Sequence, residues 1–346
     1  MELLKLLSET PGVAGVEERV QLLVKGELEK ICDEVRIDVL GNVMGTIKAK
    51  ASDRKATPIK VMIAAHMDEI GFMVRHIDRD GFVRFLPVGG FDPRTLIAQR
   101  VIIHGKEDIK GVIAPQPGWL LSDEDKKKVL EIKELFIDTG RSKEDLEKFV
   151  QVGDVISLAQ TFEELNDEVV VGRNFDDRIG VYVLIEALRR VRNNAVDIYA
   201  VATTQEELGV RGAPVAAYAI EPDIGIAIDG SLASDVPYAK EEEKNCRVGK
   251  GTGIYIIDNR TVSDSRLVNF LIKLAESNGI RYQRNLGGGT DASVIQRNKT
   301  GARVCTIGAP TRYMHSTSQL CHKQDIEETV KLLTVFLENA HRGNLV

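Results

Sequence analysis

Three short apolar runs recur along this chain, and each one stops at a residue with a polar functional group. The runs span residues 59–65, 196–202 and 224–228. A short, nearly continuous apolar run is typical of a strand that is buried on both faces of a sheet. Since such strands need helices to cover them, this feature favours an α/β fold.

Amphipathic helix patterns lie between and after these runs. Apolar residues recur at spacings of three and four over residues 181–191 and again over residues 326–340. Ser263 and Asp264 stand where an N-cap is expected before a further pattern of this kind. Strands that alternate with helices predict a mixed, largely parallel sheet that helices sandwich from both faces.

The middle of the chain interrupts this alternation with several short runs of β-type residues. The pair Asp80-Gly81 separates the first two of them, and an Asp-Gly pair in this position is a strong hairpin signal. We therefore predict a small all-β domain, residues 70–163, inserted into an α/β domain. That domain is then discontinuous and consists of residues 1–69 and 164–346.

The composition excludes several classes of partner. The 46 Lys and Arg against 52 Asp and Glu give a net charge of −6, and no segment is dense in basic residues. The chain therefore lacks the electrostatic footprint of a protein that binds nucleic acid or a membrane surface. No apolar run approaches the roughly 18 residues of a membrane span, and the first residues do not resemble a signal peptide. With four dispersed cysteines and no C-x-x-C pair, we expect a cytoplasmic protein.

The residues that end the predicted strands are the first candidates for a functional site. Ligand sites in open α/β sheets form beyond the carboxyl ends of the strands. His66 and Asp68 follow the first run, Glu206 and Glu207 follow the second, and Asp229 follows the third. One acidic residue at a strand end is commonly a cap or a solvated charge, but three strands that end in possible ligands predict a metal site.

Spacing suggests some of the roles in this site. Asp68 lies two residues after His66, so both side chains point the same way and the carboxylate can accept a hydrogen bond from the imidazole. The adjacent residues Glu206 and Glu207 diverge, so one can bind metal while the other stays free as a general base. Spacing does not say which of the two glutamates does which.

Two further choices also stay open at this point. Asp176 and Asp177 both stand at the start of the helix pattern, and either one can supply a carboxylate. His315 and His322 are both candidates for a second histidine ligand, in a predicted loop between a strand and the final helix. Mixed nitrogen and oxygen ligands suit zinc or cobalt rather than calcium.

Seven short motifs cover nearly the whole chain, namely Pro11-Gly12 with Glu17-Glu18, and residues 65–71, 172–180, 204–212, 227–229, 287–292 and 311–316. As a set and in this order, they resemble the tetrahedral (TET) aminopeptidases. These are also called glutamyl or deblocking aminopeptidases, belong to the dinuclear metallopeptidase clan, and have some members labelled endoglucanase.

The resemblance implies a ligand set for two divalent metal ions in each subunit. In such enzymes the first ion would be bound by His66 and Asp229, and the second by Glu207 and His315. Asp176 would bridge both ions. The resemblance thus selects one residue from each of the pairs that spacing leaves open.

The resemblance also implies a reaction and an assembly. A hydroxide that bridges the metals would be the nucleophile, Glu206 would be the general base and acid, and Asp68 would orient His66. The substrates would be peptides with a free amino terminus. The α/β domain would have a phosphorylase/hydrolase-like core, and the inserted domain, barrel-like, would make subunit contacts in a homo-oligomer, a dodecamer built from dimers.

Two other functions stay in consideration. A glycoside hydrolase of the endoglucanase type also needs paired carboxylates, but it does not explain two histidines and needs no dinuclear metal. A non-catalytic assembly protein with the same fold would have no need of the intact ligand set. The sequence leaves the preferred amino-terminal residue open among acidic, basic and aliphatic side chains.

Overall fold

The main sheet has eight strands in the order β1-β2-β12-β3-β13-β17-β15-β16. The computed structural model describes residues 1–50 and 58–345 of the chain. The strands are β1 (Glu34–Ile37), β2 (Val43–Ile47), β3 (Lys60–His66), β12 (Asp197–Thr203), β13 (Ile224–Ile228), β15 (Thr252–Ile257), β16 (Tyr282–Leu286) and β17 (Arg303–Gly308). Four of the pairs, β12–β3, β3–β13, β13–β17 and β15–β16, are parallel, and the other pairs are antiparallel. The predicted mixed, largely parallel sheet is thereby confirmed.

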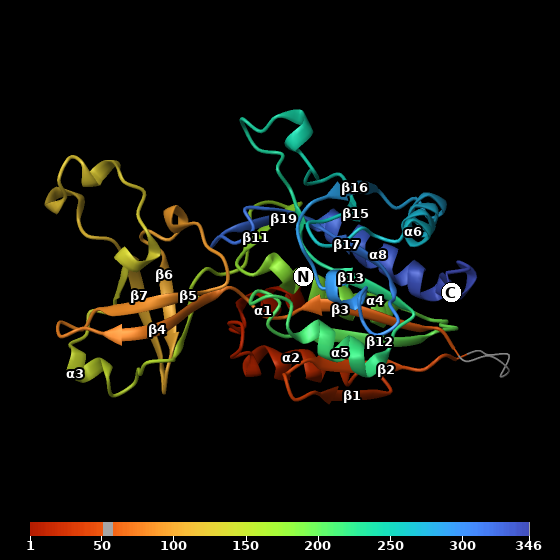
Figure 1. Ribbon diagram of the computed structural model, residues 1–346, viewed down its shortest axis with the longest axis horizontal. Coiled ribbons are helices and arrows are strands. Elements are labelled where there is room, and N and C mark those ends of the chain that lie inside the picture. Colours follow the sequence, from red (N-terminus) through yellow and green to blue (C-terminus); the bar gives the residue numbers. More distant parts are fainter. Residues whose placement is uncertain (51–57, 346) are drawn as a thin grey trace.

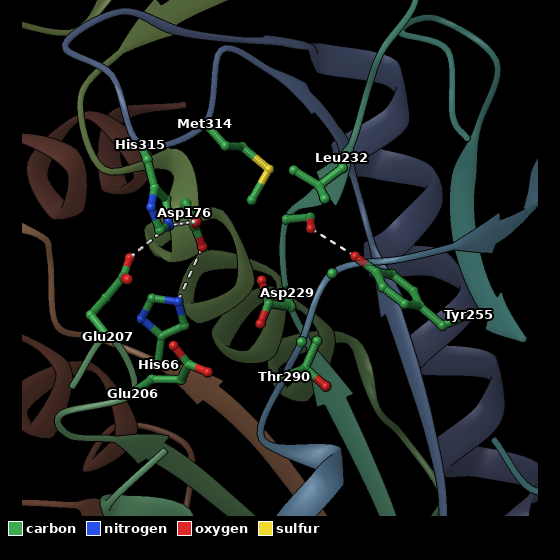
Figure 2. Close-up of a pocket in the computed structure, with 13 residues that line it drawn as sticks. His66, Asp176, Glu206, Glu207, Asp229, Leu232, Tyr255, Thr290, Met314 and His315 are labelled. Carbon is green, nitrogen blue, oxygen red and sulfur yellow. Dashed lines mark hydrogen bonds and ion pairs between the residues drawn. The ribbon is translucent and has the colours of Figure 1, made fainter. Parts of the chain in front are cut away.

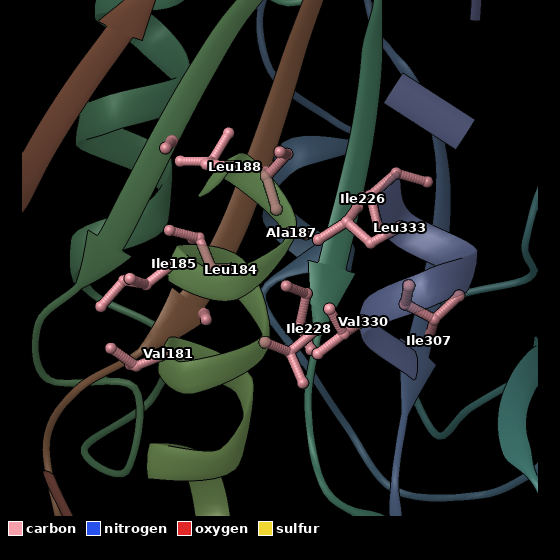
Figure 3. Close-up of a cluster of buried hydrophobic side chains, with 14 of the residues drawn as sticks. Val181, Leu184, Ile185, Ala187, Leu188, Ile226, Ile228, Ile307, Val330 and Leu333 are labelled. Carbon is pink, nitrogen blue, oxygen red and sulfur yellow. The ribbon is translucent and has the colours of Figure 1, made fainter. Parts of the chain in front are cut away.

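Helices cover both faces of this sheet, because each central strand is apolar on both sides. In β3, Val61 and Ile63 belong to one buried core while Met62 and Ala64 belong to another. The first core lies under α1 (Glu2–Glu9), α2 (Glu18–Leu28), α4 (Phe175–Arg190), α6 (Ser265–Ser277) and α8 (Lys323–Asn339), and the second under α5 (Gly212–Ile220) and α7 (Ala292–Ile295). Figure 3 shows side chains of α4 and α8 packed against the sheet in the first core.

The amphipathic patterns correspond to helices in the structure. The pattern over residues 181–191 belongs to α4, and that over residues 326–340 belongs to α8. At the start of α6 the Asp264 carboxylate accepts the backbone N–H groups of Arg266 and Leu267. Asp264 is therefore the N-cap, as its position predicts, because its side chain satisfies donors that the first helical turn leaves unpaired.

The predicted β insertion forms a closed barrel, which lies beside the α/β part in Figure 1. Its strands are β4 (Gly71–Ile77), β5 (Val83–Val88), β6 (Arg100–His104), β7 (Asp108–Ala114), β8 (Phe136–Asp138) and β9 (Val155–Leu158). The helix α3 (Lys143–Leu146) also lies within the insertion. The barrel has a hydrophobic core of its own, and its closure leaves no unpaired strand edge. The insertion is confirmed as β structure, whereas the exact residues at which the domains divide stay a prediction.

A second sheet of five strands was not predicted. It consists of β10 (Glu163–Glu164), β11 (Val169–Gly172), β14 (Ser231–Leu232), β18 (Pro310–Arg312) and β19 (Gln319–His322), in the order β10-β11-β19-β18-β14. The prediction that His322 lies in a loop is therefore wrong, since it is the last residue of β19. The pairing of β11 with β19 places the start of α4 beside the segment that connects β18 and β19.

None of the helices in the described part of the chain is both long and apolar enough to cross a membrane. The four cysteines are all free, and Cys246, Cys305 and Cys321 are buried. Burial raises the pKa of Cys246 and Cys305 to about 12, so both thiols stay protonated and pack as small apolar side chains.

Candidate metal centre

The carboxyl ends of the parallel strands β12, β3 and β13 meet at one edge of the main sheet. His66 ends β3, and Asp229 directly follows β13. Glu206 and Glu207 come shortly after the end of β12. These residues line a pocket of about 270 Å³, in which Figure 2 shows their side chains pointing toward one another. Convergence of the strand ends, which the sequence predicts, is thus present in the fold.

Two groups of possible metal ligands lie in this pocket, and they share one residue. The first group is His66, Asp176 and Asp229, and the second is Asp176, Glu207 and His315. Within each group the ligand atoms lie within 4.8 Å of one another. The shared carboxylate gives one oxygen to each side, because Asp176 Oδ1 lies 3.1 Å from His66 Nε2 and Oδ2 lies 3.2 Å from His315 Nε2.

The backbone around the ligands holds them in these positions. The N–H of Asp176 donates to Gln319 Oε1 at 2.7 Å, which ties the start of α4 to β19. His315 Nδ1 lies 3.1 Å from the carbonyl oxygen of Gly90, just after β5 of the barrel. Since a carbonyl only accepts, Nδ1 donates to it, and Nε2 is the ring nitrogen that faces Asp176 and Glu207. The contact with Gly90 therefore orients the imidazole of one candidate ligand.

Burial has the largest effect on the electrostatics of the pocket. Burial raises the pKa of Asp229 and of Glu207, since a carboxylate away from water is costly unless a cation lies beside it. Burial alone would lower the pKa of His315, but hydrogen bonds to Asp176 and Glu207 outweigh it and raise that pKa to about 11. The pocket thus favours positive charge between these side chains.

The residues present fit two divalent metal ions. Each group combines imidazole nitrogen with carboxylate oxygen, a ligand mixture that zinc and similar transition metals accept. The side chains of His66, Asp176 and Glu207 are 3%, 6% and 6% exposed, while that of His315 is 40% exposed. One side of the pocket is therefore open to solvent, as an entry path for metal and substrate requires.

Glu206 lines the same pocket and belongs to neither ligand group. Burial raises the pKa of Glu206 to about 8, partly offset by the nearby His66. Figure 2 shows its carboxylate beside His66 and below the shared Asp176. A half-buried carboxylate that lies beside the candidate ligands and belongs to neither group has the placement of a proton carrier.

Asp68 is fully buried and contacts the glutamate pair rather than only the histidine. Its Oδ1 and Oδ2 accept the backbone N–H groups of Glu206 and Glu207 at 2.9 and 3.0 Å. His66 Nδ1 lies 3.5 Å from Asp68 Oδ1, and within the described residues it has no hydrogen-bond partner. Asp68 is therefore in place to orient both the imidazole and the backbone that carries the two glutamates.

The alternative candidates have structural contacts outside the ligand groups. Asp177 Oδ1 accepts the N–H of Gly180 within α4. His322 Nδ1 accepts the N–H of Gln324 and so caps α8. Neither residue lines the pocket.

Some side chains that line the pocket were not predicted from the sequence as site residues. Leu232, Tyr255 and Met314 also line the pocket, and Figure 2 shows Leu232 and Tyr255 across the open space from the histidines and Met314 beside His315. The Tyr255 hydroxyl donates to the carbonyl oxygen of Gly230 at 2.7 Å, which fixes the ring. Tyr255 lies on β15, where no motif marks it, whereas Met314 directly precedes the ligand candidate His315.

Comparison with known proteins places this chain among peptidases. A family model described as M42 glutamyl aminopeptidase matches residues 41–332. The lysyl aminopeptidase of Pyrococcus furiosus is 37% identical, over 97% of this chain and 96% of that protein. The aminopeptidase APDkam598 from the archaeon Desulfurococcus kamchatkensis is 39% identical with a TM-score of 0.92, over 97% of this chain and 94% of that one.

Two further solved structures bear on assembly and on the glycosidase alternative. PhTET1-12s, a dodecamer in its asymmetric unit, is 31% identical with a TM-score of 0.85, over 97% of this chain and 98% of that one. A protein from Thermotoga maritima named endoglucanase is 32% identical with a TM-score of 0.80, over 97% of both chains. The family model covers well over half of the chain. This protein is therefore a member of the M42 glutamyl aminopeptidase family, whose enzymes are metallo-aminopeptidases that hydrolyse peptide bonds.

Proposed function

We propose that this chain is a two-metal aminopeptidase that releases the amino-terminal residue from peptides with a free amino terminus. The observation that carries the proposal is the shared carboxylate, since Asp176 gives one oxygen to each of two ligand groups. A second observation supports it, because Glu206 lies in the same pocket and belongs to neither group. This is the arrangement that a metal-assisted hydrolysis needs.

The proposed ligands divide between the two groups. His66 and Asp229 would hold one ion, Glu207 and His315 would hold the other, and Asp176 would bridge them. When bound, two zinc or cobalt ions supply an activated water and polarise the scissile carbonyl. The two imidazoles and three carboxylates of the chain would orient that centre, and the carboxylates would offset most of its positive charge.

Glu206 is the proposed general base and acid. Its carboxylate takes a proton from the attacking water and returns it to the amine that leaves. Burial raises the pKa of Glu206, which is the direction that suits a group that accepts a proton and then returns it. Asp68 keeps the carboxylate in place by holding the backbone N–H of Glu206.

A glycoside hydrolase is the weaker alternative, although one similar structure has the name endoglucanase. Glycosidases work with two carboxylates placed on either side of a sugar bond and need no metal. Such a reaction leaves no role for His66 and His315, whose Nε2 atoms both face Asp176. A non-catalytic assembly protein would likewise have no use for a free carboxylate in the pocket.

Removal of metal provides the test of this function. We expect hydrolysis of aminoacyl p-nitroanilides, its loss after dialysis against a chelator, and its recovery on addition of zinc or cobalt. An N-acetylated substrate serves as the control and should not be cleaved, because it lacks the free amine. Unchanged turnover after chelation, or hydrolysis of carboxymethylcellulose by the metal-free protein, would rule out the proposal. A panel of acidic, basic and aliphatic substrates gives the preferred residue.

We also propose that the chain forms a homo-oligomer in the cytoplasm, a dodecamer built from dimers through the inserted β domain, residues 70–163. The dodecameric state of PhTET1-12s supports this part of the proposal. Light scattering with a purified sample should give a mass about 12 times that of the chain if the assembly follows the usual symmetric rules. A monomer at assay concentrations would exclude the assembly and leave the catalytic proposal intact.

A further inference from the structure

Four consecutive backbone N–H groups, those of residues 204–207, each donate to a buried side chain from a distant part of the sequence. The acceptors are Asn42 Oδ1, Glu17 Oε1 and the two carboxylate oxygens of Asp68. The four donor–acceptor distances lie between 2.9 and 3.1 Å. We call residues 204–207 the glutamate turn, since it ends in the two glutamates of the candidate centre.

The carbonyl groups of the first three residues of the glutamate turn also accept hydrogen bonds. The N–H groups of Gly212 and Arg211 donate to the first two carbonyls, and those of Gly209 and Val210 donate to the carbonyl of Glu206. Each of these hydrogen bonds restrains the backbone of the turn. The turn is therefore fixed from both sides of its backbone, by its own loop and by side chains of the amino-terminal segments.

Among the acceptors of the glutamate turn, Glu17 is a residue to which the proposed mechanism gives no role. Its Oε1 accepts the N–H of Gln205 at 3.1 Å, the hydroxyl of Thr204 at 2.6 Å and the N–H of Gly15 at 2.9 Å. Glu17 is 1% exposed, and Oε2 has no hydrogen-bond partner in the described part of the chain. A single oxygen thus joins the segment before α2 to the residue that precedes the proposed general base.

Gln205 needs such a partner because of its backbone conformation. Its φ is 53°, in the left-handed region that a residue with a side chain adopts at a cost. The hydrogen bond from Gln205 to Glu17 stabilises this conformation, and the conformation sets the direction in which the chain enters Glu206. A misplacement of about 1 Å at a reacting group costs on the order of 100-fold in rate, so this direction matters.

We propose that Glu17 is a positioning residue of the aminopeptidase reaction, which acts by holding Gln205 so that Glu206 points into the pocket. The inference rests on the proposed function of Glu206. It assigns a role to the Glu17 motif near the start of the chain, whose residues do not line the pocket. Glu17 contributes through the length of its side chain and through Oε1 as a hydrogen-bond acceptor, not through its negative charge.

The electrostatics of Glu17 agree with a role that does not need the charge. Burial, together with the nearby Asp68, raises the pKa of Glu17 to about 7. A neutral side chain of the same length is therefore tolerated at this position. Glutamine has that length, and its Oε1 can accept the N–H of Gln205 and the hydroxyl of Thr204.

Two substitutions separate the effect of side-chain length at position 17 from the effect of its charge. Glu17→Gln keeps the acceptor and removes the charge, so we expect a kcat within about threefold of wild type. Glu17→Asp keeps the charge but is shorter by one methylene, so Gln205 loses its partner and kcat should fall about 10- to 100-fold. KM should change much less than kcat in both variants, because the pocket walls stay in place.

Glu328→Asp is the matched control. Glu328 is 5% exposed and accepts hydrogen bonds from Gln324 and from the backbone of Arg281, away from the glutamate turn. It should lose thermal stability as Glu17→Asp does and keep the wild-type kcat. Circular dichroism melts of all variants measure the stability part separately from the kinetics.

The results distinguish this inference from the proposed function. A wild-type protein without aminopeptidase activity would overturn the function itself. An active wild type with an equally active Glu17→Asp, or a Glu17→Gln that falls as far as Glu17→Asp, would overturn only the positioning role. If Glu17→Asp does not fold, Glu17→Gln still decides, because a tenfold or larger loss of kcat there contradicts an acceptor-only role.

Discussion

Glu206→Gln is expected to lower kcat on aminoacyl p-nitroanilides by about 10²- to 10⁴-fold, the range typical of a lost general base. Glutamine has the same shape, but its amide takes up no proton from water and returns none to the leaving amine. The backbone N–H that ties residue 206 to Asp68 is unchanged, so the turn should keep its conformation. Since Glu206 belongs to neither ligand group, the variant should bind as much metal as the wild type.

Glu328→Gln is the control for this variant, because it is the same substitution at a buried glutamate that lies outside the pocket. Its kcat should match that of the wild type. Metal content, measured by mass spectrometry on gel-filtered samples, separates a lost proton carrier from a lost ligand. A Glu206→Gln enzyme with full metal and a kcat within tenfold of wild type would show that another group moves the proton.

Much of this site was predictable because a parallel sheet collects its strand ends at one edge. His66, Asp229 and the glutamate pair each follow a buried apolar run, and those nearly continuous runs are visible in the sequence. The fold class follows from the same runs and from the helix patterns between them. The β insertion was predictable for a similar reason, because its hairpin signal is local.

The choice between neighbouring candidates was not predictable from spacing, because local contacts decide it. Asp177 bonds to Gly180 within its own helix, while Asp176 faces both histidines. His322 caps α8, while His315 projects from the segment between β18 and β19. Such differences depend on the position of one residue in a helical turn or a short hairpin. Neither the composition nor the spacing of the residues predicts that position.

The second sheet and the hydrogen bonds that fix the glutamate turn were not predicted, for other reasons. The strands β10 and β14 are too short to show alternation between buried and exposed residues. The acceptors of the turn lie far from it in sequence, as with Glu17 and Gln205, which are 188 positions apart. A hydrogen bond over such a separation becomes visible only once the fold brings the two segments together.

Asp176→Asn is expected to have the largest effect on metal binding. One oxygen of Asp176 faces His66 and the other faces His315, and asparagine replaces one of them by an NH₂ group that cannot bind a metal. We expect the metal content to fall from two ions to about one per chain, and metal affinity at the lost site to drop by more than about 100-fold. Peptidase activity should fall to the background rate.

Asp177→Asn is the matched control, since it is the same substitution at the next residue and Asp177 is also buried. Asparagine retains an oxygen that can accept the N–H of Gly180, so this variant should keep both ions and its activity. If instead Asp177→Asn lost the metal and Asp176→Asn kept it, the bridging role would belong to Asp177. If both variants kept two ions and full turnover, neither carboxylate would be a bridge, and the two ligand groups would be independent sites. The pair therefore tests the one feature that distinguishes a shared dinuclear centre from two adjacent clusters of polar side chains, a single carboxylate that faces both histidines.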